Sequence, residues 1–489
     1  MDDEGRPSAA VDPVKMRRRS KRKLLLAAAL ILAVMLVLGW WLPALLLLAT
    51  FYLLNEVMFA DHVFYDPGED YRYRLGGESL DCTLDGSQLS IEPGVDVPDT
   101  LLLRIRVSAD TSGRVLDPSV EFSASGELRR QYFERGVDGY RYLNLSAFRA
   151  HLARGESLAV SQRRCKLQHD TAELLAFANE SVVDRRVLIV APHADDAEIA
   201  AFGLYRQVPE CTIVTVTAGE TDAEQFAPWL ASGEPAEAAA RFKGRVRCLD
   251  GVAAAIWGGV PQERCIALGY GCMQLEAMRG EPESPVVSPF SALDDTRPFR
   301  AFNRVQLPTD GDGRASWNNL LRDLTAIVAE FRPEVIVTAH PLLDKHPDHI
   351  AATQAVWHAV SNSPEPHPRW LLYANHLQVS QHYPFGPAHS ELGLPPQLGR
   401  DLALDSVFSV SLDRQAQRDK ALALDLMHDL KRPVRVKKWL RKRLQKLLLA
   451  RPVTPYGEDD FFRKAVRASE VFLVLEAGSF DRTMRGLED

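Results

Sequence analysis

The chain has 489 residues, of which 46% are hydrophobic, and a formal net charge of -7. This length exceeds one ordinary hydrophobic core and predicts two or three domains. The negative net charge excludes a general nucleic-acid binder, because such a protein needs more basic than acidic side chains to neutralise phosphates. The six cysteines include no C-x-x-C pair, so they indicate neither a disulfide scaffold nor a thiolate zinc site.

A long apolar run follows a basic N-terminus. Residues 1–23 end in a cluster of lysines and arginines, and residues 24–54 then run for 31 positions without a charged side chain. About 20 apolar residues span a bilayer, so we expect a transmembrane segment here, either one tilted or kinked helix or a re-entrant hairpin. A cleaved signal peptide fits poorly, because its apolar core runs for only about 7–15 residues.

This segment predicts a location in the cell (inner) membrane and makes membrane lipids expected partners. The basic residues before it predict a cytoplasmic N-terminus. The distribution of charge around the segment then favours an extracytoplasmic position for the rest of the chain. A re-entrant hairpin would instead suit the cytoplasmic leaflet. The sequence therefore does not decide on which side of the membrane the catalytic domain lies.

Residues 60–175 contain short alternating runs such as LLLRIRV at 101–107, separated by glycine-containing turns. These patterns predict a small β-rich, sandwich-like domain. No catalytic cluster occurs in it. Its role could be to bind a glycan or partner, or to act as a spacer.

From residue 184 onwards, strand patterns alternate with helical ones. We expect buried strands at 187–191, 211–217, 334–339 and 370–379, an amphipathic helix at 317–331, and long loops over 258–315. Alternation of this kind predicts an α/β fold with a Rossmann-like, mostly parallel sheet.

Two of these strands end in polar clusters. His193, Asp195 and Asp196 follow the first strand, and HPLLDKHPDH at 340–349 follows the strand at 334–339. Open α/β sheets bind their ligands at the carboxyl ends of strands, so both clusters are expected in one crevice. His193 and Asp196 can point into the same site while Asp195 faces elsewhere.

The second cluster opens a helix, because Pro347 suits the first helical position. The spacing of His346 and His349 places both imidazoles near that helix end. Two histidines and one carboxylate leave open positions on a zinc ion, as a catalytic site requires. The same donors could also hold Fe²⁺.

HADDAE at 193–198, TVTAGE at 215–220 and HPDH at 346–349 resemble the motifs of the PIG-L or LmbE-like family of zinc-dependent N-acetylglucosaminide de-N-acetylases. The resemblance covers roughly residues 184–480, and we expect the deacetylase domain to comprise residues 184–489. It implies zinc ligands at His193, Asp196 and His349 and a general base at Asp195. It also implies an oxyanion-stabilising or proton-donating role for His346, with Asp348 as its partner in catalysis. The family's usual proline and glycine are replaced by Ala194 and Ala200.

The expected chemistry agrees with these roles. A bound metal lowers the pKa of its water and polarises the acetyl carbonyl. Asp195 can accept the proton of the water, and His346 can stabilise the oxyanion. We expect Glu198 and Asp344 to orient neighbouring groups or open helices, and His340 to be structural.

The resulting hypothesis is a membrane-anchored hydrolase that removes an N-acetyl group from an amino sugar of a cell-envelope glycolipid or polysaccharide, such as lipopolysaccharide. The alternative is a non-catalytic, membrane-tethered glycan-binding or scaffold protein whose deacetylase motif has degenerated. Metal content would discriminate the two, because a scaffold need not hold zinc.

Residues 431–451 form a separate basic segment, KRPVRVKKWLRKRLQKLLLAR, with leucines at helical spacing and no acidic residue. This composition predicts a basic amphipathic helix that lies on anionic lipid. The other interpretation is an ordinary helix with its apolar side in the core and a solvated basic face.

Overall fold

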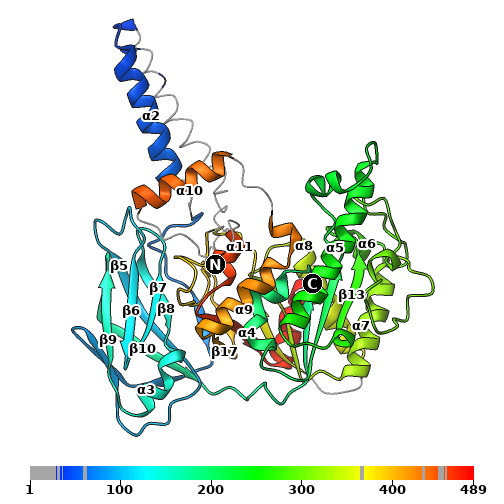
Figure 1. The fold of residues 1–489 in the computed structure, drawn as a ribbon. Coiled ribbons are helices and arrows are strands. Elements are labelled where there is room, and N and C mark those ends of the chain that lie inside the picture. The colour runs from blue at the N-terminus through cyan, green and yellow to red at the C-terminus, as the bar shows by residue number, and fades with distance from the viewer. Residues whose placement is uncertain are drawn as a thin grey trace, which may run out of the picture.

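The computed structural model describes residues 29, 34–35, 37–58, 63–363, 368–380, 382–431, 436–449, 456 and 460–488. Two bodies lie side by side in this part of the chain, a β-sandwich and the α/β body that follows it (Figure 1). They meet along β17 (Ser406–Ser411). Ser409 of this strand donates its N–H to the Thr100 hydroxyl at 3.2 Å, and its own hydroxyl accepts from Asn144 at 2.8 Å.

The sandwich consists of two antiparallel sheets. One has the strand order β2-β10-β5-β8 and the other β3-β4-β9-β6-β7. Side chains such as Leu103, Ile105 and Val120 are fully buried between the sheets. The elements are β2 (Glu78–Leu80), β3 (Cys82–Asp85), β4 (Gln88–Ile91), β5 (Thr100–Ala109), β6 (Ser119–Ala124), β7 (Glu127–Tyr132), β8 (Asp138–Asn144), α3 (Arg149–Ala153), β9 (Leu158–Arg163) and β10 (Cys165–Phe177). Whether this body binds a glycan or acts as a spacer stays a prediction.

A seven-stranded sheet of order β13-β12-β11-β14-β15-β18-β17 forms the centre of the α/β body. Its other strands are β11 (Val187–Ala191), β12 (Cys211–Thr217), β13 (Cys265–Tyr270), β14 (Val335–Ala339), β15 (Arg369–Tyr373) and β18 (Ser469–Leu475). The first five strands in this order are parallel, whereas β18 runs antiparallel to both of its neighbours. The predicted mostly parallel sheet is therefore wrong. The sheet is mixed, because β17 and β18 add an antiparallel pair at one edge.

Helices cover both faces of this sheet (Figure 1). One face packs against α7 (Trp317–Phe331), α8 (Pro347–Ser361) and α12 (Ala477–Glu488), and the other against α4 (Asp196–Tyr205), α5 (Ala236–Trp257), α9 (Arg414–Asp425) and α11 (Asp460–Ala465). Because both faces are covered, the central strands β11, β12 and β14 are buried along their whole length. The short strands β1 (Tyr73–Leu75) and β16 (Leu402–Leu404) pair in parallel outside the main sheets.

The segment 258–315 is more regular than expected. It contains β13 and the short helix α6 (Leu275–Gly280), where the sequence predicts only long loops. Gly269 within β13 has a φ of 74°, and a Cβ there would lie 2.7 Å from the carbonyl oxygen of Thr296. This close approach needs glycine, whose presence weakens the strand pattern in the sequence.

The transmembrane segment predicted over residues 24–54 is wrong. The described part of that run includes α2 (Trp41–Met58), and none of the helices in the described part of the chain is long and apolar enough to cross a membrane. Gly39 divides the run, because its φ of 75° is left-handed and cannot belong to a right-handed helix. Residues 1–23 lie outside the described residues.

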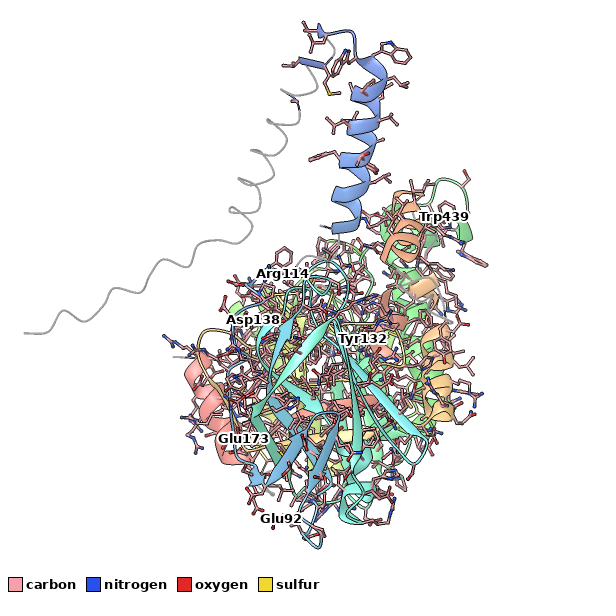
Figure 2. All side chains as sticks on the ribbon, turned by 90° about the vertical axis from the view of Figure 1, so that its left-hand side faces the viewer. Glu92, Arg114, Tyr132, Asp138, Glu173 and Trp439 are labelled. Atoms are coloured by element: carbon pink, nitrogen blue, oxygen red, sulfur yellow. The ribbon has the colours of Figure 1, made fainter. Side chains whose placement is uncertain are left out.

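The basic segment at 431–451 is helical over α10 (Val436–Leu449), which contacts α2. Figure 2 shows Trp439 of α10 at the end of the molecule from which α2 projects. Val436 and Leu447 are 80% and 79% exposed, so this helix does not bury all of its apolar side chains. Residues 432–435 and 450–451 lie outside the described residues. Contact with lipid stays a prediction.

Helix α4 is broken in its middle at Ala201, where φ is -138° and ψ is 15°. At the break, one carbonyl and two N–H groups of the backbone bond to side chains. Lys420 donates to the carbonyl of Ile199 at 2.9 Å, and Glu470 accepts the two N–H groups, those of Gly203 and Leu204, at 2.8 and 3.0 Å. Lys420 and Glu470 also pair with each other at 2.6 Å and are almost fully buried. This ion pair therefore replaces the missing helical hydrogen bonds.

Replacing Lys420 with methionine is expected to lower the free energy of unfolding by about 3–5 kcal/mol, because it leaves the buried charge of Glu470 unpaired. Arg485→Met is the control. It removes the exposed pair of Arg485 with Asp481 and should change stability little. Urea unfolding followed by circular dichroism measures both variants. Equal losses of stability in the two variants would contradict the role of the buried pair Lys420–Glu470.

Candidate metal centre

The predicted metal-binding residues lie where the strand order of the sheet reverses. From β11 the chain proceeds through β12 to β13 on one side, and β14 and β15 lie on the other side. The carboxyl ends of β11 and β14 therefore flank the topological switch point, where open α/β sheets bind ligands. His193 follows β11, Asp196 is the first residue of α4, and His346 and His349 lie at the start of α8.

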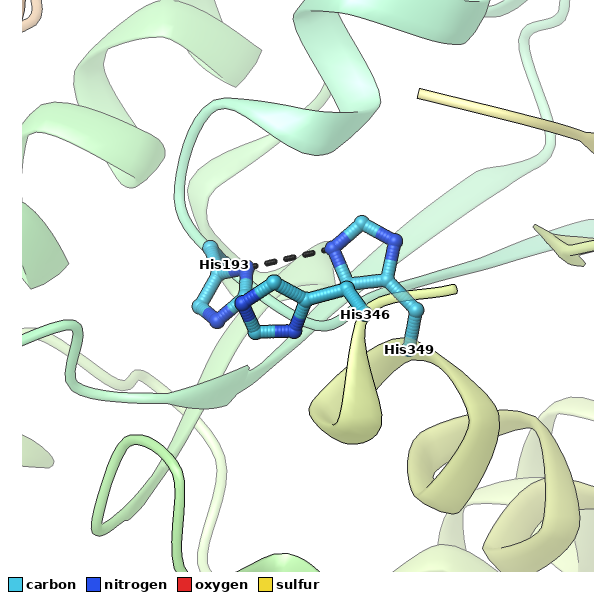
Figure 3. A group of neighbouring side chains, drawn as sticks. All are labelled: His193, His346 and His349. Carbon is cyan, nitrogen blue, oxygen red and sulfur yellow. Dashed lines mark hydrogen bonds between the residues drawn. The ribbon is translucent and has the colours of Figure 1, made fainter. Parts of the chain in front are cut away.

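Three donor atoms converge at this point. The distances are 3.1 Å from His193 Nδ1 to Asp196 Oδ2, 3.0 Å from that oxygen to His349 Nε2, and 3.3 Å between the two ring nitrogens. The dashed line in Figure 3 joins the rings of His193 and His349. Donors about 2.0–2.1 Å from a tetrahedral zinc ion lie about 3.3 Å apart, so this triangle fits such an ion. We refer to these three residues as the donor triangle.

Asp344 orients the donor His349. Its Oδ2 lies 3.0 Å from His349 Nδ1 and also accepts the backbone N–H groups of Asn375 and His376 at 2.9 and 3.2 Å. The Asn375 side chain donates to Asp196 Oδ1 at 2.8 Å. A carboxylate behind a histidine fixes the ring and its tautomer, as in metal sites generally. Asp344 thus orients a neighbour, as the sequence predicts.

Asp348 has a different position from the one implied by the resemblance. Its Oδ2 lies 3.2 Å from His193 Nε2 and accepts the backbone N–H of Met273 at 2.7 Å. The thiol of Cys272 lies 3.5 Å from the same oxygen. The Asp348 carboxylate therefore holds the donor His193, and only its backbone N–H contacts His346.

His346 lies beside the donor triangle. Its ring centroid is 4.8 Å from that of His193 and 4.9 Å from that of His349 (Figure 3). Nδ1 accepts the N–H of Asp348 at 3.2 Å, so this ring caps α8. Burial, with the charges of His193 and His349, lowers the pKa of His346 to about 4. The ring is therefore neutral at pH 7 with its proton on Nε2, where it can act as a hydrogen-bond donor.

Asp195 stands outside the donor triangle and binds Arg247. Arg247 Nη2 donates to Asp195 Oδ1 at 3.0 Å, and Nη1 donates to Asp429 Oδ2 at 2.6 Å. Burial would lower the pKa of Arg247, but the carboxylates of Asp195 and Asp429 raise it above its usual value. Arg247 thus remains charged and fixes the orientation of Asp195. The sequence carries no pattern that singles out Arg247, because its partners lie 52 and 182 positions away.

Two further polar residues of the motifs, His340 and Glu198, are fully buried. His340 is fully buried, and burial lowers its pKa to about 3, so the ring is neutral. Burial raises the pKa of Glu198 to about 8, and this carboxyl accepts from the Tyr205 hydroxyl at 3.2 Å. Cys272, Asn375 and His376 reach the centre from loops that sequence reasoning did not connect to it.

Three overlapping groups of potential ligands also lie close together. Within each group the ligand atoms are within 4.8 Å of one another, and the groups are His193 with His346 and His349, His193 with Cys272 and Asp348, and Asp196 with His349 and His376. All three groups share members with the donor triangle. The described residues therefore form one centre surrounded by further polar groups.

This arrangement defines an α/β domain with a buried centre of two histidines and one carboxylate, and a separate carboxylate beside it. Residues 188–360 match the family model described as PIG-L, GlcNAc-PI de-N-acetylase. The chain therefore carries a PIG-L domain, and the predicted family resemblance is confirmed.

Other comparisons add little to this assignment. Among the curated proteins, none matches the chain. The similar solved structures include teicoplanin deacetylase Orf2 in a zinc-inhibited form, at 17% identity and a TM-score of 0.31, covering 60% of this chain and 98% of that one. A conserved Thermus thermophilus protein has 18% identity and a TM-score of 0.27, covering 56% and 93%. The Pseudomonas putida hydratase GalB has 14% identity and a TM-score of 0.30, covering 59% and 95%.

Replacing Asp344 with asparagine is expected to weaken zinc binding about 10- to 100-fold, because His349 loses the carboxylate that orients it. Competition with a chelator measures the dissociation constant. The control is Asp323→Asn, which changes another buried carboxylate of the same body, bound to Arg300 at 2.7 Å. It should reduce stability and leave zinc affinity unchanged. A loss of affinity in both variants would contradict the prediction.

Zinc binding to the metal-free protein is expected to tighten as the pH rises towards 9. Burial would lower the pKa of His349, but Asp196 and Asp344 raise it to about 9. Below that pH the ring must lose its proton to bind an ion, so affinity should rise at least about tenfold per pH unit. Chelator competition at pH 6.5, 7.5 and 8.5 measures the slope. A flat profile would show that His349 is not a ligand.

Proposed function

We propose that the protein is a zinc-dependent N-deacetylase that acts on an N-acetylated amino sugar of a glycoconjugate. The observation that carries this proposal is the donor triangle with Asp195 beside it, in a domain of the PIG-L family. The family description names a de-N-acetylase of GlcNAc-PI, which supports an amino sugar as the acylated group.

His193, Asp196 and His349 would hold the metal. A metal in such a centre supplies Lewis acidity and a nucleophile that forms at neutral pH. Zn²⁺ suits these donors. Fe²⁺ would suit them too, but a free carboxylate next to the donors favours hydrolysis over oxygenase chemistry.

Asp195 is the proposed general base. Its carboxylate is adjacent to the donor triangle in sequence and bound to Arg247, not to the donors. Arg247 holds Oδ1 and so fixes the plane of the carboxylate. In this position Asp195 can accept a proton from the attacking water and pass it to the departing amine, a role that typically contributes about 100- to 10,000-fold to the rate.

His346 is the proposed oxyanion donor. The neutral ring is anchored through Nδ1 at the N-terminus of α8, which leaves the Nε2 proton for the substrate. Asp348 is assigned a supporting role instead of a catalytic one, because its carboxylate holds the donor His193.

The alternative of a degenerate scaffold rested on Ala194 in place of the family's proline. Ala194 is buried, and its Cβ lies 3.3 Å from the position that a Cβ at Gly251 of α5 would take. Packing against α5 therefore supports the turn at this residue. The intact donor triangle also favours an enzyme.

Asp195→Asn is expected to reduce acetate release at least about 100-fold and to leave zinc content unchanged, because Asp195 is not a donor. Asp184→Asn, an exposed carboxylate close to the same strand, is the control and should behave as wild type. The probes are N-acetylglucosamine and N-acetylglucosaminyl phosphatidylinositol, with acetate measured enzymatically and zinc by mass spectrometry. The proposal fails if the zinc-loaded wild type releases no acetate from either probe, or if Asp195→Asn is fully active.

A further inference from the structure

The second nitrogen of the His193 ring faces ligand atoms that the donor triangle does not use. His193 contributes Nδ1 to the triangle, whereas its Nε2 lies 3.2 Å from Asp348 Oδ2. The Cys272 thiol lies 3.5 Å from the same oxygen. The ligand atoms of these three residues are within 4.8 Å of one another, and all three residues are buried. We refer to His193 Nε2, Cys272 Sγ and Asp348 Oδ2 as the thiol cluster.

The spacing of the thiol cluster fits a divalent ion. Zinc binds nitrogen and oxygen at about 2.0–2.1 Å and thiolate sulfur at about 2.3 Å, so the ligand atoms of a tetrahedral ion lie about 3.3–3.6 Å apart. The distances from Asp348 Oδ2 to the other two ligand atoms, 3.2 and 3.5 Å, are close to this range. An ion can therefore replace the protons between these atoms without a large movement of the side chains.

The charges around the thiol cluster favour a cation. Asp348 and Glu220 are both fully buried, and Glu220 accepts the backbone N–H of Cys272 at 3.1 Å with each of its carboxylate oxygens. In the described part of the chain, neither carboxylate pairs with a lysine or an arginine. Buried carboxylates are costly without a positive partner, so a cation beside them would be stabilised.

One oxygen of Asp348 has no partner. Its Oδ1 is buried and forms no hydrogen bond among the described residues, whereas its Oδ2 also accepts the N–H of Met273 at 2.7 Å. Buried polar atoms normally have partners, so an unpaired carboxylate oxygen beside the thiol cluster indicates a missing positive group. An ion held by Oδ2 could also be reached by Oδ1, because a carboxylate can bind a cation through both oxygens.

The thiol cluster lies close to solvent. Cys272 is carried by a short loop, and the next residue of this loop, Met273, is 44% exposed. The His193 side chain is 11% exposed. A small ion therefore has only a short distance to cross between solvent and the cluster.

We propose that the thiol cluster binds a second divalent cation, of the kind that prefers sulfur and imidazole ligands, such as Zn²⁺ or Cd²⁺. The Cys272 thiol loses its proton on binding, because the thiolate is the form that binds metal. His193 also releases its Nε2 proton and then bridges two ions, the first on Nδ1 and the second on Nε2. The second ion binds more weakly than the first, because the two positive charges repel each other across one ring.

Cobalt can report on the Cys272 thiolate. The full-length protein is stripped of metal, titrated with Co²⁺ and followed by absorption spectroscopy. A thiolate bound to cobalt gives a sulfur-to-cobalt charge-transfer band in the near ultraviolet, which nitrogen and oxygen ligands do not give. In the wild type we expect this band to grow after the donor triangle has been filled. In Cys272→Ser we expect the donor triangle to fill as in the wild type and the band to be absent.

Cys265→Ser is the matched control. Cys265 is another buried thiol of the same body, and it belongs to none of the groups of potential metal ligands in the described part of the chain. Its thiol donates to the carbonyl of Pro261 at 3.3 Å, a hydrogen bond that serine can also form. This variant should keep the charge-transfer band. The proposal is overturned if the wild type shows no band, or if Cys272→Ser keeps it, which would mean that another cysteine binds cobalt adventitiously.

Equilibrium dialysis against Cd²⁺ gives an independent measure. At the same free concentration of Cd²⁺, we expect about two ions per chain in the wild type and about one in Cys272→Ser. Equal numbers in the two proteins would also overturn the proposal. Neither measurement uses acetate release, so failure of the proposed deacetylase function would leave both results valid. A single ion bound without the charge-transfer band would refute the second cation alone.

Discussion

The structure depends on the convergence of three lone-pair donors that would repel one another without a cation or proton between them. Two imidazole nitrogens and a carboxylate oxygen lie 3.0–3.3 Å apart in a site from which water is largely excluded. His193 and His349 each have a carboxylate on the opposite ring nitrogen, which prevents the rings from turning away. The surrounding fold serves to bring the ends of β11 and β14 to the same place and to fix these carboxylates there.

The centre is electrostatically balanced by groups outside the donor triangle. Arg247 joins Asp195 to Asp429, so one cation holds two acidic side chains from different parts of the chain. His346 stays neutral because the histidine donors and burial both disfavour its charged form. A neutral ring beside a cation site keeps its proton available as a hydrogen-bond donor and does not add further repulsion.

Sequence patterns predicted the parts of the fold that are set by local periodicity. The buried β-branched runs at Val187–Ala191 and Cys211–Thr217 and the amphipathic helix Trp317–Phe331 occur as expected. Patterns could not reveal the direction of β18, because a fully buried strand reads the same in a parallel and an antiparallel pair. They also missed the break at Gly39, since one glycine barely changes the mean hydropathy of a long apolar run.

The sequence likewise predicted only part of the candidate site. His193, Asp196, His346 and His349 are adjacent to one another in two short motifs, so the sequence alone indicates them. Arg247, Cys272 and Asn375 reach the centre only through tertiary structure, and the Asp348 carboxylate proves to hold His193. Short motifs therefore identify the donors, whereas the groups that orient them depend on contacts between distant segments.

The family match ends at residue 360, yet the chain beyond it completes the centre. Asn375 binds Asp196, Asp429 holds Arg247, and Lys420 with Glu470 supports the broken helix that begins at Asp196. During synthesis, the ribosome releases the histidine motifs long before these supports exist. The polypeptide can therefore assemble the complete centre, with these supports, only after the final strand of the sheet has been synthesised.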